Sequence, residues 1–168
     1  MLFLQVIQKK SYLRLSVLTQ KIVPQNPPPN EKTPLKTNRK FILVGEDDID
    51  DQEFLKEIFA AIDNSFELFF VNNGVQVLSE LENLEDKNLP CLIVLDYNMP
   101  GLNGAEILKE LKRNSRYNRI PKIIWSTSRS NTYKDICLSL GATDYVVKPS
   151  NVNGLTQTAQ YMLSFCMI

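Results

Sequence analysis

The sequence of 168 residues contains no histidine. Catalytic groups that pair a serine or a cysteine with histidine are therefore excluded, and so are zinc sites that require an imidazole ligand. Any chemistry in this chain has to depend on carboxylates, hydroxyls, amides and lysines.

Cysteine is also scarce. The three cysteines, Cys91, Cys137 and Cys166, lie far apart and form no C-x-x-C pair. An odd number of widely spaced cysteines is not typical of a disulfide framework or of a thiolate metal site. We interpret all three as reduced thiols in the core of a cytoplasmic protein.

Long apolar runs are missing, and no stretch approaches the roughly 18 residues of a membrane span. The charges sum to zero but are unevenly distributed. Residues 1–40 hold eight basic residues and one acidic residue, a net charge of +7, whereas residues 41–168 hold 11 basic and 18 acidic residues, a net charge of −7. An acidic folded region is a poor match for a phosphate backbone, so we expect no nucleic-acid partner.

Proline is concentrated near the N-terminus, where five of the nine prolines lie between Pro24 and Pro34. Such a stretch predicts an extended linker. We therefore divide the chain into residues 1–38, a basic and disordered extension, and residues 39–168, a single folded domain. The alternative for the extension is a short amphipathic helix that contacts a membrane or a partner.

Five apolar segments of strand length alternate with helical periodicity along the rest of the chain: residues 41–45, 66–71, 91–95, 122–126 and 144–147. Strict alternation with short connections predicts parallel strands joined by right-handed crossovers. Continuous apolar strands indicate a sheet that is covered on both faces. We predict an α/β fold with a doubly wound, five-stranded parallel sheet.

Polar residues indicate where the helices begin and end. The candidates for N-caps are Asp50 or Asp51, Asn73, Ser130 or Asn131, and Ser150 or Asn151. The helix that carries Tyr133, Ile136, Cys137 and Leu140 on its apolar face is expected to end at Gly141.

Polar side chains follow four of the five predicted strands, and in a parallel sheet these strand ends share one edge. They are Glu46-Asp47-Asp48, Asp96, Ser126-Thr127-Ser128 and Lys148-Pro149. Crowded carboxylates need compensating positive charge. Lys148 and a divalent cation can supply it, and a donor set of hard oxygens favours Mg²⁺, with Mn²⁺ tolerated.

Four motifs resemble the receiver domain of two-component response regulators, of the stand-alone chemotaxis-regulator type. They are ILVGEDD (42–48), IVLDYNMPGLNG (93–104), PKIIWSTS (121–128) and GATDYVVKPS (141–150), and the resemblance covers about residues 39–166. It implies a flavodoxin-like sheet with strand order 2-1-3-4-5. It also implies a phosphoacceptor switch that signals through protein contacts and is not a turnover enzyme.

The resemblance assigns roles to individual residues. Asp96 is the phosphoacceptor, Asp47 binds the metal directly, and Glu46 binds it through water. Asn98 offers its backbone carbonyl to the metal. Lys148 binds the phosphoryl group, and its bond to Pro149 is expected to be cis.

The same resemblance identifies the switch. Ser126 is the switch hydroxyl, and Tyr145 is the aromatic side chain that turns inward when the hydroxyl moves. Tyr97, Asn98 and Ser128 flank the site and tune the lifetime of the acyl phosphate. Gly45 and Trp125 depart from the commonest pattern, which affects packing but not chemistry.

Because the chain has no histidine, the phosphoryl donor is a histidine kinase, a histidine phosphotransfer protein or a small acyl phosphate. The downstream target is an unidentified protein, and a homodimer of the phosphorylated form is possible. Two alternatives remain close to this interpretation: a phosphate shuttle or sink without direct output, and a receiver with an inactive site. A phosphohydrolase of the haloacid-dehalogenase type is disfavoured, because it needs an acid where this chain has Asn98.

Overall fold

The computed structural model describes residues 40–167, so the predicted N-terminal extension lies outside the described residues. The strands are β1 (Phe41–Gly45), β2 (Glu67–Val71), β3 (Leu92–Asp96), β4 (Lys122–Ser126) and β5 (Asp144–Val147). The helices are α2 (Ile49–Ile62), α3 (Gly74–Asn83), α4 (Gly104–Lys112), α5 (Asn131–Ser139) and α6 (Val152–Ser164), with short 3-10 turns η2 (Asp86–Asn88) and η3 (Ser115–Tyr117). Within residues 40–167, no helix is both long enough and apolar enough to cross a membrane.

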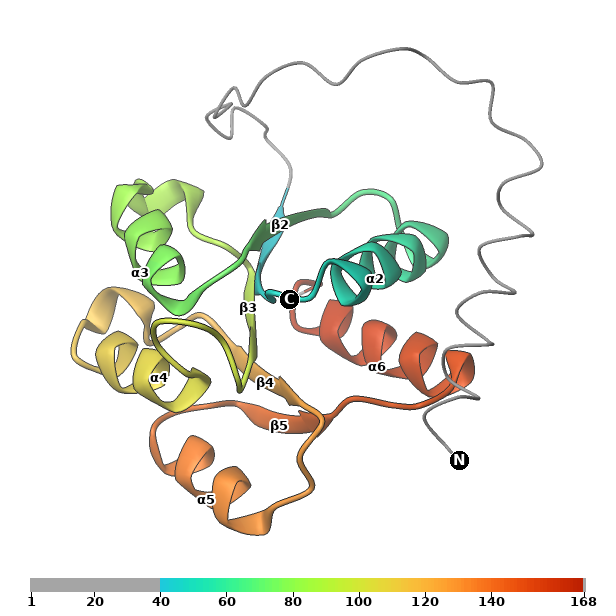
Figure 1. The fold of residues 1–168 in the computed structure, drawn as a ribbon. Coiled ribbons are helices and arrows are strands. Elements are labelled where there is room, and N and C mark those ends of the chain that lie inside the picture. Colours follow the sequence, from blue (N-terminus) through green and yellow to red (C-terminus); the bar gives the residue numbers. More distant parts are fainter. Residues whose placement is uncertain (1–39, 168) are drawn as a thin grey trace. The chain divides into compact units, whose positions relative to one another are not determined.

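The strands form one parallel sheet in the order β2-β1-β3-β4-β5, which confirms the predicted fold. Helices α2 and α6 cover one face, and α3, α4 and α5 cover the other (Figure 1). Since all strands run in the same direction, their carboxyl ends lie at one edge and their amino ends at the opposite edge.

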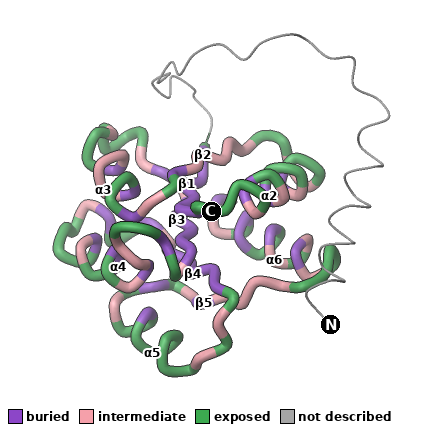
Figure 2. The backbone as a smooth tube through the Cα atoms, in the orientation of Figure 1, coloured by how far each residue is buried: buried purple, intermediate pink, exposed green. Residues whose placement is uncertain are grey.

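The three central strands, β1, β3 and β4, are buried along their whole length, as Figure 2 shows. Helices on both faces exclude water from them, which explains why their sequences are continuously apolar. On the α2 and α6 side the core includes Val44, Phe59, Trp125 and Met162. The edge strand β2 is only partly buried.

The helix caps agree with the sequence at three of the four helices for which a cap was predicted. Asn73, Ser130 and Asn151 cap α3, α5 and α6 through hydrogen bonds from backbone N–H groups. The assignment of Asp50 or Asp51 as the cap of α2 was wrong. Asp48 is the cap, because its extended backbone places its carboxylate where it accepts from the N–H groups of both residues.

Helix α5 is less buried than its sequence pattern predicts. Cys137 is its only buried residue, whereas Tyr133 and Ile136 are each 41% exposed. The helix lies beside the edge strand β5, so only a narrow stripe faces the sheet. The helix is followed, as expected, by Gly141 with a positive φ of 99°, a conformation that glycine adopts without a steric penalty.

The interpretation of all three cysteines as free thiols was wrong. Cys91 and Cys166 form a disulfide between the start of β3 and the end of α6, with their Cα atoms 5.1 Å apart. The two residues are 75 positions apart in the chain, so no spacing pattern indicates the pair. The fold brings them together, and only Cys137 is a free, buried thiol among the described residues.

Candidate functional site

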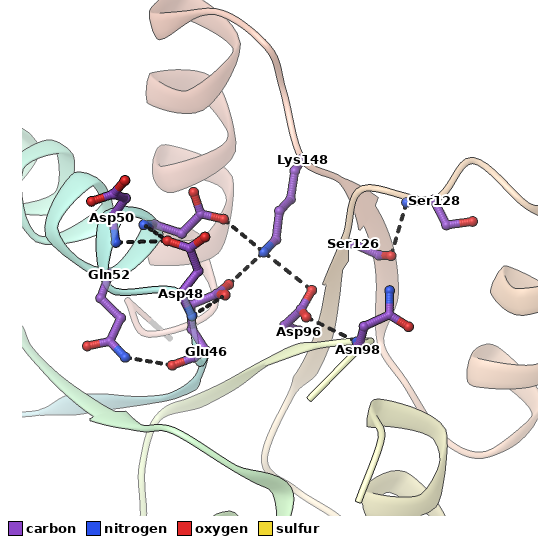
Figure 3. A network of polar contacts seen from close by, with 10 residues as sticks. Glu46, Asp48, Asp50, Gln52, Asp96, Asn98, Ser126, Ser128 and Lys148 are labelled. Atoms are coloured by element: carbon purple, nitrogen blue, oxygen red, sulfur yellow. Dashed lines mark hydrogen bonds and ion pairs between the residues drawn. The ribbon is translucent and has the colours of Figure 1, made fainter. Parts of the chain in front are cut away.

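Four side chains that the sequence singled out lie at the carboxyl edge of the sheet. Asp96 and Ser126 are the last residues of β3 and β4. Glu46 directly follows β1, and Lys148 directly follows β5. Figure 3 shows the lysine side chain reaching toward both Glu46 and Asp96.

Lys148 is the centre of this group. Its Nζ atom lies 2.6 Å from Glu46 Oε2, 3.1 Å from Asp51 Oδ2 and 3.3 Å from Asp96 Oδ1. Burial by itself would lower the pKa of Lys148, but the hydrogen bond and charge of Glu46 and the charges of Asp96 and Asp51 raise it. The lysine therefore stays charged and binds three carboxylates at once.

The crowding of acidic groups affects the pKa of Glu46. The pKa of Glu46 is raised to about 7, and burial is the largest cause. The charges of Asp96 and Asp51 act in the same direction, whereas the hydrogen bond and charge of Lys148 oppose the shift. One lysine is therefore not enough to neutralise the acidic group, and an additional cation would bind favourably there.

The carboxylates of Glu46, Asp47 and Asp96 form a candidate cation site. One oxygen of each lies within 4.8 Å of the others, and Asp47 is exposed while the other two are buried. The donors are all carboxylate oxygens, without thiolate or imidazole. This donor set fits a hard divalent cation such as Mg²⁺.

The backbone after β3 holds the second oxygen of Asp96. The Asn98 N–H donates to Asp96 Oδ2 at 3.0 Å, so the two carboxylate oxygens have different partners. Asn98 itself is exposed at the rim of the site. The role of the Asn98 carbonyl as a metal ligand stays a prediction.

The β4–α5 loop continues from the site toward the surface. Ser126 is fully buried, and its Oγ accepts a hydrogen bond from the Ser128 N–H at 3.1 Å. Tyr145 is buried, and its hydroxyl donates to the Ser128 carbonyl at 3.1 Å. The ring that was expected to turn inward therefore lies inward in this structure.

The Lys148–Pro149 peptide bond is trans, as are all other peptide bonds between the described residues. The expected cis bond was therefore wrong. The two isomers of an X-Pro bond differ by only about 0.5–1 kcal/mol in the absence of tertiary contacts, so sequence alone does not decide between them.

Two site residues were missed by sequence reasoning. Asp51 was treated as a helix cap, but it pairs with Lys148. It belongs to the acidic run EDDIDD (46–51) that directly follows the first strand, and this proximity in sequence to Glu46 and Asp47 is a signal that could have identified it. Gln52 is buried and its Nε2 donates to the Glu46 carbonyl at 2.6 Å and to Asn72 Oδ1 at 2.9 Å, which holds the β1–α2 turn in place.

The two departures from the family pattern have packing explanations. A Cβ atom at Gly45 would lie 2.9 Å from the side chain of Met99. The Met99 side chain therefore occupies the space that a larger residue at position 45 would need. Trp125 is buried, and its ring lies 5.9 Å from Lys148 Nζ. Its indole N–H has no hydrogen-bond partner among the described residues.

Comparison with known proteins assigns this arrangement to a class. The response regulator receiver domain matches residues 42–160, which is more than half of the chain. The protein therefore belongs to the response regulator receiver family and is a phosphoacceptor signalling switch of the two-component type.

Particular relatives include the response regulator Rcp1 of Synechocystis, which is 30% identical over 129 residues, or 75% of this chain and 88% of Rcp1. The two-component response regulator ARR3 of Arabidopsis thaliana is 27% identical over 79% of this chain, which spans only 59% of ARR3.

Solved structures agree with the fold. The Mn²⁺-bound form of Rcp1 has a TM-score of 0.66 and 29% identity, and covers 75% of this chain and 93% of its own. The phosphorylated cyanobacterial phytochrome response regulator RcpA has a TM-score of 0.69 and 27% identity, and covers 77% of this chain and 94% of its own.

Proposed function

We propose that Asp96 is the phosphoacceptor of this receiver domain. The observation that supports this best is the position of its carboxylate, which lies 3.3 Å from Lys148 Nζ within a cluster of three acidic residues. We assign this function to residues 39–168, the predicted folded domain, whereas the predicted extension of residues 1–38 lies outside the described residues.

The reaction is a phosphoryl transfer from a phosphohistidine of a kinase or phosphotransfer protein. A carboxylate oxygen of Asp96 forms the new P–O bond, the P–N bond of the donor breaks, and the freed imidazole takes a proton. A small acyl phosphate can serve as donor in the same way, with a P–O bond breaking and a carboxylate leaving.

The residues around Asp96 match the charge that this transfer spreads over the phosphoryl oxygens. Lys148 binds one of these oxygens, since it already lies against Asp96. The Ser126 hydroxyl and the Asn98 N–H bind another. The Asn98 N–H donates to Asp96 Oδ2 at 3.0 Å, which places it beside the acceptor.

A resident Mg²⁺, with Mn²⁺ as a substitute, would be held by Asp47 directly, by Glu46 through water, by Asp96 and by the Asn98 carbonyl. When bound, the cation neutralises carboxylate and phosphoryl charge. The three carboxylates within 4.8 Å support this assignment, and the related Rcp1 has a Mn²⁺-bound form.

The acyl phosphate is lost by slow hydrolysis, because the chain has no histidine to act as a general base. Tyr97, Asn98 and Ser128 tune that rate. The protein is therefore a switch and not a turnover enzyme.

The signal is passed to a partner protein through the inward arrangement of Tyr145 and the surface formed by α5, β5 and α6. Beside this surface, Arg129, Lys134 and Lys148 line a cavity of about 520 Å³. A downstream protein binds this surface, and the phosphorylated form can pair with a second copy. A role as a phosphate shuttle or sink is the second candidate.

We place the protein in the cytoplasm, where its kinase partners phosphorylate it. The Cys91–Cys166 disulfide opposes this assignment, since reducing compartments rarely retain disulfides.

The test is the Asp96→Asn substitution. We expect it to abolish the stoichiometric phosphoryl adduct that acetyl phosphate forms with Mg²⁺, as measured by intact mass spectrometry. Asp50→Asn is the matched control, because Asp50 is an exposed acid near the site but outside the cluster. An undiminished adduct in Asp96→Asn would disprove the assignment.

A further inference from the structure

Three tyrosine rings connect the phosphoacceptor strand to the exposed surface of α5. Tyr97 directly follows Asp96, and its ring stacks on Tyr133 with centroids 4.8 Å apart and planes inclined by 16°. The same Tyr97 ring meets the edge of Tyr145 with centroids 6.4 Å apart. Tyr97 is therefore in contact with α5 through Tyr133 and with β5 through Tyr145.

The inward position of Tyr145 is connected to the proposed switch hydroxyl. The hydroxyl of Tyr145 donates to the Ser128 carbonyl, and the Ser128 N–H donates to Ser126 Oγ. The Ser128 hydroxyl in turn accepts from the N–H of Ser130, the N-cap of α5. The Tyr145 ring, the Ser126 hydroxyl and the first turn of α5 consequently belong to one connected set of contacts.

The stack has a feature that ordinary core packing does not explain. Tyr133 is 41% exposed, while Tyr145 is only 5% exposed, so the stacked ring is the part of the cluster at the surface. Tyr97 is half-buried between them. Because the Tyr133 ring is partly open to water, it acts on the cluster through its stack on Tyr97. This stack limits where the Tyr97 ring can lie.

We propose that Tyr133 is a positioning residue of the switch. Its stack on Tyr97 holds that ring against Tyr145, and it thereby stabilises the inward arrangement of Tyr145 and Ser126 that accompanies a phosphoryl group on Asp96. This inference rests on the proposed function, because it presupposes that Asp96 carries the phosphoryl group and that Ser126 contacts it. A stacked aromatic pair changes an equilibrium by about two- to tenfold.

The experiment uses the full chain with beryllofluoride, which occupies the place of a phosphoryl group on a carboxylate. Trp125, the only tryptophan, lies next to Ser126 and reports binding by its emission. At saturating Mg²⁺ we expect Tyr133→Ala to raise the Kd for beryllofluoride about two- to tenfold. Tyr133→Phe keeps the ring and should stay close to the wild type. The Kd for Mg²⁺ alone should be the same in all variants.

Ile136→Ala is the matched control, because Ile136 is on the same helix and is also 41% exposed. A double-mutant cycle with Tyr97→Leu tests the route: Tyr133→Ala should have no further effect once Tyr97 is replaced. The proposal is overturned if Tyr133→Ala binds beryllofluoride as tightly as Ile136→Ala does. It is also overturned if Mg²⁺ affinity falls in parallel, or if the two substitutions are additive.

Failure of the proposed function gives a different result. In that case the wild type itself shows no beryllofluoride response, or Asp96→Asn keeps the wild-type response. A normal wild-type response with no effect of Tyr133→Ala rejects only the role of Tyr133.

Discussion

Two lysines, the buried Lys122 and the partly buried Lys148, lie at opposite edges of the sheet and make opposite kinds of contact. Lys148, at the carboxyl edge, binds the carboxylates of Glu46, Asp51 and Asp96. Lys122, at the amino edge, donates to two neutral carbonyls, those of Tyr117 at 2.6 Å and Ile120 at 2.7 Å. Carboxylate partners raise the pKa of Lys148 against the effect of burial, whereas burial lowers the pKa of Lys122.

The carboxyl edge is therefore a binding edge, and the amino edge is a structural edge. At the amino edge the polar groups have partners within the protein: Lys122 caps carbonyls, Lys40 Nζ donates to the Cys166 carbonyl at 2.8 Å, and a disulfide joins β3 to α6. At the carboxyl edge three acids face one lysine, and the excess negative charge is left for a cation to balance. Loss of contacts should therefore affect stability at one edge and phosphorylation at the other.

The largest effect on stability should come from the disulfide. In the chain-entropy description, closing a loop of 75 residues stabilises the folded state by about 4 kcal/mol. We expect a thiol reductant to lower the free energy of unfolding by about that amount, as measured by urea denaturation. Phosphorylation of the folded, reduced protein should be unchanged, because the pair lies at the edge away from Asp96.

Cysteine variants supply the control. Cys91→Ala should remove the response to reductant, and Cys137→Ala should keep it, since Cys137 is free. Burial raises the pKa of Cys137 to about 11, so the native thiol should resist alkylation at neutral pH. Alkylation after unfolding without reductant should modify one thiol per chain; modification of three would show that the pair is not oxidised.

An intermediate effect is expected from Lys122→Met. The substitution removes the lysine hydrogen bonds to two buried carbonyls, of which that of Tyr117 keeps a bond from the Ile120 N–H. The loss should cost about 2 kcal/mol of stability by thermal unfolding. Phosphorylation by acetyl phosphate should be preserved. Lys109→Met, at an exposed lysine of α4, is the control and should change stability by less than about 0.5 kcal/mol.

Lys148→Met is the matched substitution at the other edge, and it should reduce the rate of phosphorylation by about a hundredfold. Equal loss of phosphorylation in Lys122→Met and Lys148→Met would contradict the separation of the two edges.

The pH dependence of the same variants has opposite signs. The folded pKa of Lys122 is below its ordinary value of 10.5, so the unfolded chain binds this proton more tightly and stability rises with pH just below 10.5. The folded pKa of Lys148 is above 10.5, so its contribution is complete below that pH and is lost as pH rises through the folded value. The rise in stability with pH just below 10.5 should therefore be lost in Lys122→Met and kept in Lys148→Met.

The smallest effect should come from the metal. Mg²⁺ at ten times its Kd should stabilise the wild type by about 1.4 kcal/mol, because it binds only the folded protein. Asp47→Ala should lose this increment in a thermal shift assay, while Asp50→Ala, also exposed and acidic, should retain most of it. An equal Mg²⁺ shift in wild type and Asp47→Ala would place the cation elsewhere.

Much of the binding edge could be predicted from the sequence, and little of the structural edge. Glu46, Asp96, Ser126 and Lys148 each directly follow or end a strand, so the parallel topology is sufficient to bring them together. The Cys91–Cys166 disulfide depends on how α6 packs beside the start of β3, and this packing has no local signature in the sequence. Lys122 looked like an ordinary first residue of a strand until the carbonyls of η3 and its following turn were placed around it.

By itself, the sequence determined the five alternating units, the parallel sheet and the residues at its carboxyl edge, because apolar periodicity and strand ends are local properties of the chain. Tertiary structure alone decided which carboxylates share Lys148, which cysteines are joined, and that Tyr133 stacks on Tyr97 instead of entering the core. These contacts depend on the distances between side chains of different elements. Such distances are set by how helices pack on the sheet, and not by the order of residues within any one segment.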